Sequence, residues 1–238
     1  MSTTKESEET VLSQILENMT KNYLAEIGDL KGGYSSERDL AEYEAVIQMS
    51  REEMRDKLIL DVGMSVKFLL DALKENLNVV ILEGYKGRSV VPRLSKYVRF
   101  GLAQEMPFPS NSFDLVIANS TVPLHLKSGD DFGALLSFYQ LLRVCKPDGK
   151  VAVCPLPSED KLKAEGIIDL NQPNFPRNVR WSIDLIPLLE QCNLEYECLP
   201  CGGGNRGEYV FHIQKSFSSD SKPIQRQLVR LGKTKVYG

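Results

Sequence analysis

The sequence predicts an α/β protein with a parallel sheet, because short apolar runs alternate with amphipathic helical stretches along the chain. The clearest such unit runs from Leu58 to Glu83. Its first apolar run leads into Gly63, which permits a tight turn, and its second apolar run ends on Glu83. The residues between them have helical spacing. A parallel strand–helix–strand unit puts the end of its first strand and the start of its helix at one ligand-sized crevice.

Length and composition indicate one globular domain with small additions. The chain has 238 residues, of which 42% are hydrophobic and 26% charged, enough to build a sizeable core. A net charge of −3 gives no general case for nucleic-acid binding. No apolar run reaches about 18 residues, so we expect no membrane span. The polar start, MSTTKESEET, argues against secretory and transit peptides.

Cysteine and histidine usage predicts an intracellular, cytoplasmic protein without a metal site. The five cysteines are an odd number. Cys198 and Cys201 are separated by two residues, but no second such pair follows. Reduced thiols are therefore expected. The two histidines, His125 and His212, are too few to favour a metal site.

Residues 1–56 are expected to form an N-terminal helical cap. Apolar residues at helical spacing predict one helix over residues 9–27, and Ser36 with Asp39 resembles the start of a second. Residues 1–57 hold 13 acids and seven bases. Two interpretations are open: a solvated acidic face, or a lid over the crevice at the end of the first strand.

The rest of the chain continues the alternation. Further strands are expected at Val98 and Phe100, at 113–117 and at 151–156, the last after a KPDGK turn, with a helix that begins near Ser128. A loop is expected over 158–180 and a helix over 181–191. The strands predicted at 194–199 and 209–214 suggest an antiparallel hairpin at one edge of the sheet.

Three stretches resemble the class I S-adenosylmethionine-dependent methyltransferases, and most closely the group called type 11. They are LILDVG with the later LE, GLAQEMPFPSNSFDLVIAN, and LLRVCKPDGKVAV. The resemblance implies a Rossmann-like seven-stranded sheet with helices on both faces and an antiparallel final hairpin. It covers about residues 57–214, and we take 57–215 as a methyltransferase-like domain.

The cofactor loop departs from the family pattern. The family reads GxGxG, whereas this chain retains Gly63 but carries Ser65 and Lys67. Leu102 stands where the family has an acid that receives the adenine amino group, and an apolar side chain cannot accept that hydrogen bond. The resemblance therefore implies S-adenosylmethionine binding that is weak or absent.

Several residues are candidates for the cofactor site. Glu83 occupies the family's ribose position, and Ala103 offers a backbone N–H to the adenine ring. Asp61 either orients the loop or caps it. The cofactor-binding set is Asp61, Gly63, Ser65, Glu83, Leu102, Ala103 and Asn119. Type 11 members often carry a histidine at His125, which makes it the one candidate for a catalytic base, although a lone histidine is more often structural.

Two functions from different classes remain open. One is a pseudoenzyme: a non-catalytic or weakly binding methyltransferase-like scaffold or partner-binding protein. The alternative is an active methyltransferase that acts on a small molecule or a protein, since methyl transfer requires little beyond in-line positioning. The altered loop and Leu102 favour the first, whereas Glu83 and the intact core signatures favour the second.

The C-terminal tail, residues 216–238, is basic. Residues 215–238 hold six bases and one acid, Asp220. Residues 216–223 read as a flexible linker, and Ile224, Leu228 and Leu231 could line one face of a short helix. The tail either docks on the protein's own acidic N-terminal cap or forms an arm that binds an acidic protein, RNA or an anionic surface.

Overall fold

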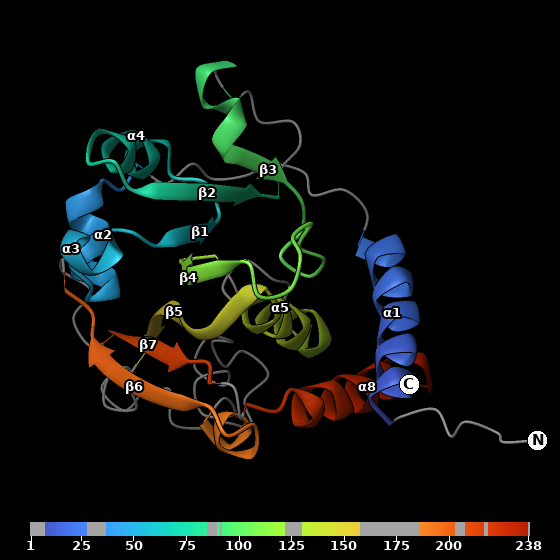
Figure 1. Cartoon of the computed structure of the whole chain (residues 1–238). Helices are drawn as coiled ribbons and strands as arrows, with labels where there is room; N and C mark the ends of the chain where they lie inside the picture. The colour runs from blue at the N-terminus through green and yellow to red at the C-terminus, as the bar shows by residue number, and fades with distance from the viewer. Residues whose placement is uncertain are drawn as a thin grey trace, which may run out of the picture.

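A single twisted sheet of seven strands forms the centre of the computed structural model, which describes residues 8–27, 37–84, 90, 92–121, 130–157, 186–202, 208–216 and 219–237. The strand order is β3-β2-β1-β4-β5-β7-β6, with β7 antiparallel to both of its neighbours (Figure 1). The strands are β1 (Leu58–Val62), β2 (Asn78–Glu83), β3 (Val98–Phe100), β4 (Phe113–Asn119), β5 (Cys145–Pro157), β6 (Glu195–Pro200) and β7 (Glu208–Gln214). The predicted fold class and the terminal hairpin are confirmed.

Helices cover both faces of this sheet (Figure 1). The helices are α1 (Glu8–Ile27), α2 (Leu40–Ile47), α3 (Arg51–Met54), α4 (Val66–Lys74), α5 (Asp131–Val144) and α8 (Lys222–Tyr237), with a 3-10 helix η1 (Pro92–Tyr97) and a helical stretch at 186–191. One face packs against α2, α3 and α4, and the other against α1, α5 and α8. Among the described helices, none is long and apolar enough to cross a membrane.

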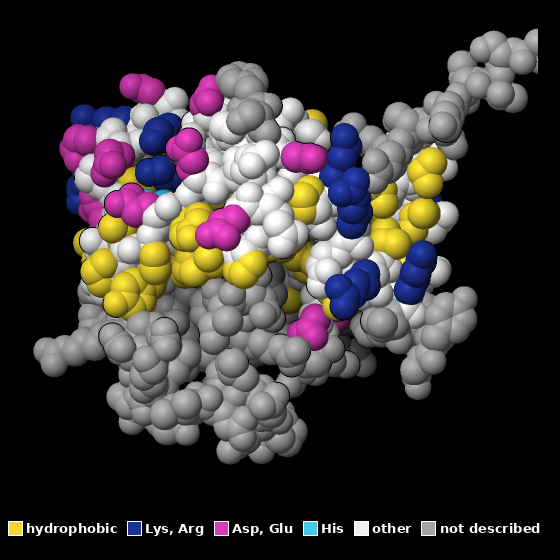
Figure 2. Space-filling view, turned by 90° about the horizontal axis from the view of Figure 1, so that it is seen from below, with side chains coloured by type: hydrophobic (Ala, Val, Ile, Leu, Met, Phe, Trp, Pro, Cys, Tyr) yellow, Lys and Arg dark blue, Asp and Glu magenta, His cyan; other side chains and the backbone are white. Residues whose placement is uncertain are grey.

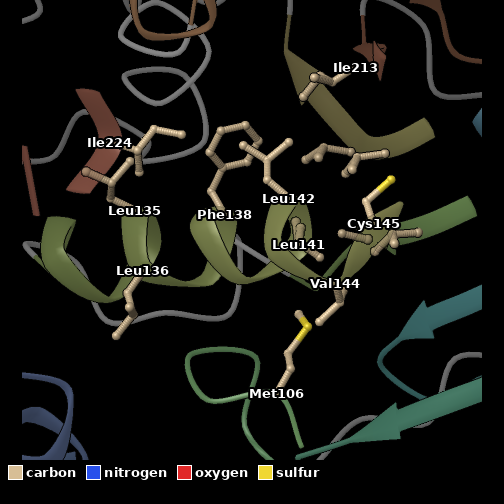
Figure 3. Close-up of a cluster of buried hydrophobic side chains, with 14 of the residues drawn as sticks. Met106, Leu135, Leu136, Phe138, Leu141, Leu142, Val144, Cys145, Ile213 and Ile224 are labelled. Carbon is tan, nitrogen blue, oxygen red and sulfur yellow. The ribbon is translucent and has the colours of Figure 1, made fainter. Parts of the chain in front are cut away.

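Helix α5 is the most deeply buried of these helices because it packs on two sides. Figure 3 shows Leu135, Phe138 and Leu142 directed toward Ile213 and Ile224, while other side chains of α5 point away from them. Eleven of its 14 residues are buried. This explains the many apolar residues of the stretch, since a helix that is covered on most of its surface has little need for a polar face.

The stretches that carry the family resemblance contact one another directly. Arg143 donates hydrogen bonds to the carbonyl oxygens of Met106 (2.9 Å) and Phe108 (2.8 Å). Lys146 pairs with Asp114 at 2.8 Å, and the same carboxylate accepts from the backbone N–H of Leu58 at 2.9 Å. These charged residues therefore fix the loop before β4, the end of α5 and the start of β1 to one another.

Two details of the chain differ from expectation. The KPDGK segment lies within β5: Asp148 adopts a left-handed conformation (φ 63°) and donates its N–H to the Lys215 carbonyl, and the Lys215 N–H donates to the Gly149 carbonyl. The tail does not begin as a flexible linker in its described part, since Asp220 donates its N–H to the Cys192 carbonyl and α8 starts at Lys222.

The two N-terminal helices lie on opposite faces of the sheet. Helix α1 packs on α8 through the core that contains Leu16 and Tyr23, whereas α2 packs on α4 through Tyr43 and Ile47. The tail helix docks on α1, and it does so through apolar residues: Ile224 and Leu228 are fully buried. The division of the chain at residues 56 and 216 stays a prediction.

We expect Leu228→Ala to lower the free energy of unfolding by about 2–5 kcal/mol, because it removes a fully buried side chain from the interface between α8 and the core. Urea denaturation measures the change. Val11→Ala on α1 is the control, with an expected effect within about 0.5 kcal/mol, since Val11 is exposed. Equal effects of the two substitutions would show that α8 is not part of the cooperative core.

Stability should fall as pH drops below 6.5 because of His212. Its Nε2 lies 2.6 Å from the carbonyl oxygen of Ile47, and burial lowers the pKa of the imidazole below its ordinary value of 6.5. The unfolded chain then binds the proton more readily than the folded chain. The contribution of neutral His212 to the free energy of unfolding is therefore complete above pH 6.5, and it is lost as the pH falls toward the pKa of the folded state. Thermal melts from pH 5 to 8 of the protein and of His212→Gln, which keeps a donor but does not titrate, isolate this contribution. Identical pH profiles would contradict the assignment.

Candidate functional site

The predicted site residues converge at the carboxyl ends of β1, β2 and β4. Asp61 lies in β1, and Glu83 and Asn119 are the last residues of β2 and β4. All three side chains are buried. The backbone N–H of Gly63 donates to the Leu82 carbonyl at 2.8 Å and that of Gly101 to the Glu83 carbonyl at 3.0 Å, so hydrogen bonds fix the exits of these strands. These three residues therefore meet at the edge of the sheet where the sequence predicts a ligand crevice, and the crevice itself stays a prediction.

The carboxyl group of Asp61 is wholly buried and accepts hydrogen bonds from Tyr43. The Tyr43 hydroxyl lies 3.1 Å and 3.3 Å from its two oxygens. The Tyr43 ring stacks on Phe68, the first buried residue of α4, with centroids 3.8 Å apart. Burial raises the pKa of the Asp61 carboxyl well above its usual range, against the opposing effects of the Tyr43 hydrogen bond and of the Arg38 charge. Burial and the nearby Asp61 carboxyl likewise raise the pKa of Tyr43.

The two residues that replace loop glycines both bind the chain just before α2. Ser65 is the N-cap of α4: its Oγ accepts from the Phe68 N–H, and the same hydroxyl donates to the Arg38 carbonyl at 2.6 Å. Lys67 forms an ion pair with Asp39 at 2.9 Å. Serine at position 65 therefore has a structural use that glycine could not provide.

Arg38 joins the start of α4 to the exit of β4. Its Nη1 donates to the Asn119 side-chain oxygen at 2.8 Å and to the Ser120 hydroxyl at 2.6 Å. Through Arg38, Asp39 and Tyr43, residues 38–43 contact the exit of β1, the start of α4 and the exit of β4. We call these six residues the strap. The sequence left two interpretations of the N-terminal region, a solvated acidic face and a lid over the end of the first strand. For the strap, these contacts favour the lid.

Thr121 occupies the space over the one retained glycine. Gly63 has φ 97°, a conformation that favours glycine, and a Cβ built on it would lie 2.1 Å from the Thr121 methyl carbon. Glycine at position 63 lets another group come close to the backbone, and in this structure that group is the Thr121 side chain.

The adenine side of the predicted site is half-buried and apolar. Leu102 and Ala103 follow β3 in a turn closed by the N–H of Glu105 on the Leu102 carbonyl, and Ala103 packs against the core. The side chain of Leu102 offers no acceptor. His125 lies outside the described residues, and the described part of the chain contains no cluster of three or more potential metal ligands.

Two buried polar atoms at the exit of β4 have no hydrogen-bond partner. They are the Asn119 side-chain nitrogen and the Thr121 hydroxyl oxygen. Asn119 is 5% exposed, and its other amide atom is bonded to Arg38. Buried groups of this kind are usually satisfied, so the pair is a feature that an acceptor-bearing ligand could complete.

Sequence reasoning missed the polar roles of Arg38 and Tyr43. Tyr43 was expected only on the apolar face of a helix, and it does pack there, but its hydroxyl also reaches Asp61. The sequence predicted a helix that starts at Ser36, with Asp39 three residues on, whereas Asp39 is itself the N-cap of α2 and Ser36 lies outside the described residues. No signal paired that helix start with the exit of β4, about 80 residues away along the chain.

Residues 60–153 match the family model described as a methyltransferase domain. This range begins in β1 and ends in β5, and so contains the strand exits at which the site lies. Over this segment the chain is similar to the methyltransferase domain family, and its sheet has the Rossmann-like methyltransferase fold. No curated protein sequence matches it.

Several solved structures are similar to this chain in fold. The PH0226 protein of Pyrococcus horikoshii is 16% identical, with a TM-score of 0.54 over 82% of this chain and 99% of that one. A 1,6-didemethyltoxoflavin-N1-methyltransferase of Burkholderia thailandensis is 13% identical, with a TM-score of 0.49 over 91% and 93% of the two chains. A possible histamine N-methyltransferase of Thermotoga maritima is 15% identical, with a TM-score of 0.45 over 85% and 99%.

Tyr43→Phe should lower the free energy of unfolding by about 1–3 kcal/mol, because it leaves the buried Asp61 carboxyl without its hydrogen-bond donor. Chemical denaturation at pH 7 measures this loss. Tyr97→Phe on η1 is the matched control, since that ring is only half-buried. A loss no greater than the control's would show that the Asp61–Tyr43 contact is not important for stability.

Proposed function

We propose that this protein is a methyltransferase-fold scaffold or partner-binding protein with a weakened S-adenosylmethionine site, non-catalytic or only weakly cofactor-binding. The observation that carries the proposal is the strap, which lies across the carboxyl ends of β1 and β4 and is held by Ser65, Lys67, Asn119 and Ser120. These are the positions at which the family resemblance puts cofactor contacts.

The residues present do not fit S-adenosylmethionine well. The cofactor would supply an activated methyl group, and Asp61, Gly63, Glu83 and Ala103 are the retained residues that would hold it. Against this, Thr121 covers Gly63, and the Ser65 hydroxyl is committed to the Arg38 carbonyl. Leu102 cannot receive the adenine amino group, at a cost of about 1–3 kcal/mol. That cost alone corresponds to roughly a 5- to 150-fold loss of affinity.

Displacing the strap adds a further cost. The Arg38 hydrogen bonds are charge-assisted, and such bonds contribute about 1.5–3 kcal/mol each when both partners lose contact with water. The Lys67–Asp39 pair contributes little, since the lysine side chain is 55% exposed. Arg38 is therefore the residue of the strap that most opposes a ligand at the exit of β4.

An active methyltransferase is the second candidate function. The unpartnered Asn119 nitrogen and Thr121 hydroxyl favour it, because a bound ligand would satisfy both. Glu83, buried at the end of β2, favours it too. A small molecule or a protein would then be the substrate, and no further catalytic side chain is essential when positioning alone promotes transfer.

The proposed partner-binding role rests on the basic C-terminal tail, through which a protein or RNA would bind. We further propose an intracellular, cytoplasmic setting. The five cysteines support it: all are free, and Cys145, Cys154 and Cys192 are buried.

Calorimetric titration with S-adenosylmethionine and S-adenosylhomocysteine tests the cofactor proposal. We expect dissociation constants above about 100 μM, or binding free energies weaker than about −5.5 kcal/mol. The triple substitution Ser65→Gly, Lys67→Gly, Leu102→Asp should raise the affinity, because it frees the loop and restores an acceptor. Adding Glu83→Gln to the triple variant is the control and should remove the gain.

A dissociation constant of a few micromolar for the unmodified protein, about −7 to −8 kcal/mol, would contradict this proposal. The active methyltransferase would then be the better account. In that case Arg38→Ala should weaken the binding of S-adenosylmethionine, whereas a strap that opposes the cofactor predicts stronger binding.

A further inference from the structure

We propose that the outer face of α8, with the neighbouring exposed part of α1, binds an acidic amphipathic segment of a partner protein. This gives the partner of the proposed function a chemical class and a surface. It does not depend on whether the cofactor binds, since it concerns the core face opposite to that of the strap-bearing helix α2.

Four cations line the outer face of α8. They are Lys222, Arg226, Arg230 and Lys233, which we call the cation row. At about 100° and 1.5 Å per residue, they fall within an arc of about 80° and span about 16 Å along the helix. Arg226, Arg230 and Lys233 are exposed, and Lys222 is half-buried. The sequence of α8 contains five bases and no acid.

Helix α8 presents the cation row in a fixed position. Its opposite face buries Ile224 and Leu228 in the core. Gly232 permits a close crossing, because a Cβ there would lie 2.8 Å from the terminal methyl of Met19 on α1 and 3.4 Å from the Phe132 ring on α5. A row held in this way loses less conformational entropy on binding than the same charges on a flexible arm.

Hydrophobic side chains lie beside the cations. Figure 2 shows Lys and Arg side chains next to hydrophobic ones on the part of the surface where α1 and α8 lie. Val11 of α1 is 39% exposed, and Leu12 and Ile15 are half-buried. A surface that combines cations with an apolar strip fits a helix with acidic and apolar residues on adjacent faces.

The negative charge of the rest of the chain argues against an anionic membrane or a long nucleic acid as the partner of the cation row. The net charge is −3, so outside the five bases of α8 the chain carries −8. On the face shown in Figure 2, most Asp and Glu side chains lie on the side away from α1 and α8, and a few lie beside the Lys and Arg side chains. An anionic membrane or a long nucleic acid would extend over these acids, whereas a short acidic segment along α8 would contact fewer of them.

Single-stranded RNA is further disfavoured by the lack of a stacking platform. The described aromatic side chains that are exposed are Phe100 on β3 and Tyr196 on β6, and neither lies on α1 or α8. Sequence-tolerant binding of single strands combines a basic groove with aromatic side chains on which the bases stack. The cation row supplies only the charge.

Fluorescence anisotropy with a labelled synthetic peptide tests the proposal. The probe is an amphipathic helix about 16 residues long, the length of α8, with Glu on one face and Leu on the adjacent one. We expect saturable binding that weakens as salt is raised. Arg226→Glu with Arg230→Glu should reduce affinity at least about tenfold. Arg93→Glu with Lys96→Glu on η1 changes the charge equally at another exposed site and should leave affinity unchanged.

Other outcomes overturn the proposal. They are an absence of saturable binding to the peptide, equal losses in the two double variants, or tighter binding to oligouridine or to phosphatidylserine vesicles. Thermal melts establish that each variant is folded, and Arg226→Gln with Arg230→Gln replaces the charge reversal if that variant does not fold. A failed peptide experiment leaves the calorimetric result with S-adenosylmethionine unaffected, so the two proposals fail separately.

Discussion

The hydrogen bond between Tyr43 and the buried Asp61 is the contact on which the arrangement of the site depends. It joins α2 to the central strand β1 and provides the donor for a carboxyl group that has lost its contact with water. With Tyr43 stacked on Phe68, α2 is fixed against α4, and the residues that precede it must pass over the exits of β1 and β4. The position of Arg38 follows from this geometry.

The same positions can serve a cofactor or the protein's own chain, and in this structure the chain itself uses them. Ser65 caps α4 and binds the strap, Lys67 pairs with the N-cap of α2, and Thr121 covers the glycine. Two of the three departures from the family pattern, Ser65 and Lys67, thus have intramolecular partners. These contacts connect the start of α4 to the strap.

The C-terminal helix illustrates how one segment can be both part of the core and part of the surface. Its apolar face completes the core formed by α1 and α5, and its basic face remains outside. The tail therefore contributes to stability whether or not a partner exists. Buried apolar area stabilises α8 in place, and charge on the opposite face determines what can approach it.

The sequence by itself determined the α/β class and the parallel pairing of β1 with β2, because apolar periodicity and turn residues act locally. The sequence also identified Ser65, Lys67 and Leu102 as residues that differ from the family's cofactor-site pattern. Only the tertiary structure decided what those departures do. The contacts of Arg38 with Asn119, of Ser65 with the strap and of α8 with α1 join residues that are distant along the chain. Such pairings depend on how the helices pack on the sheet, and no local pattern encodes them.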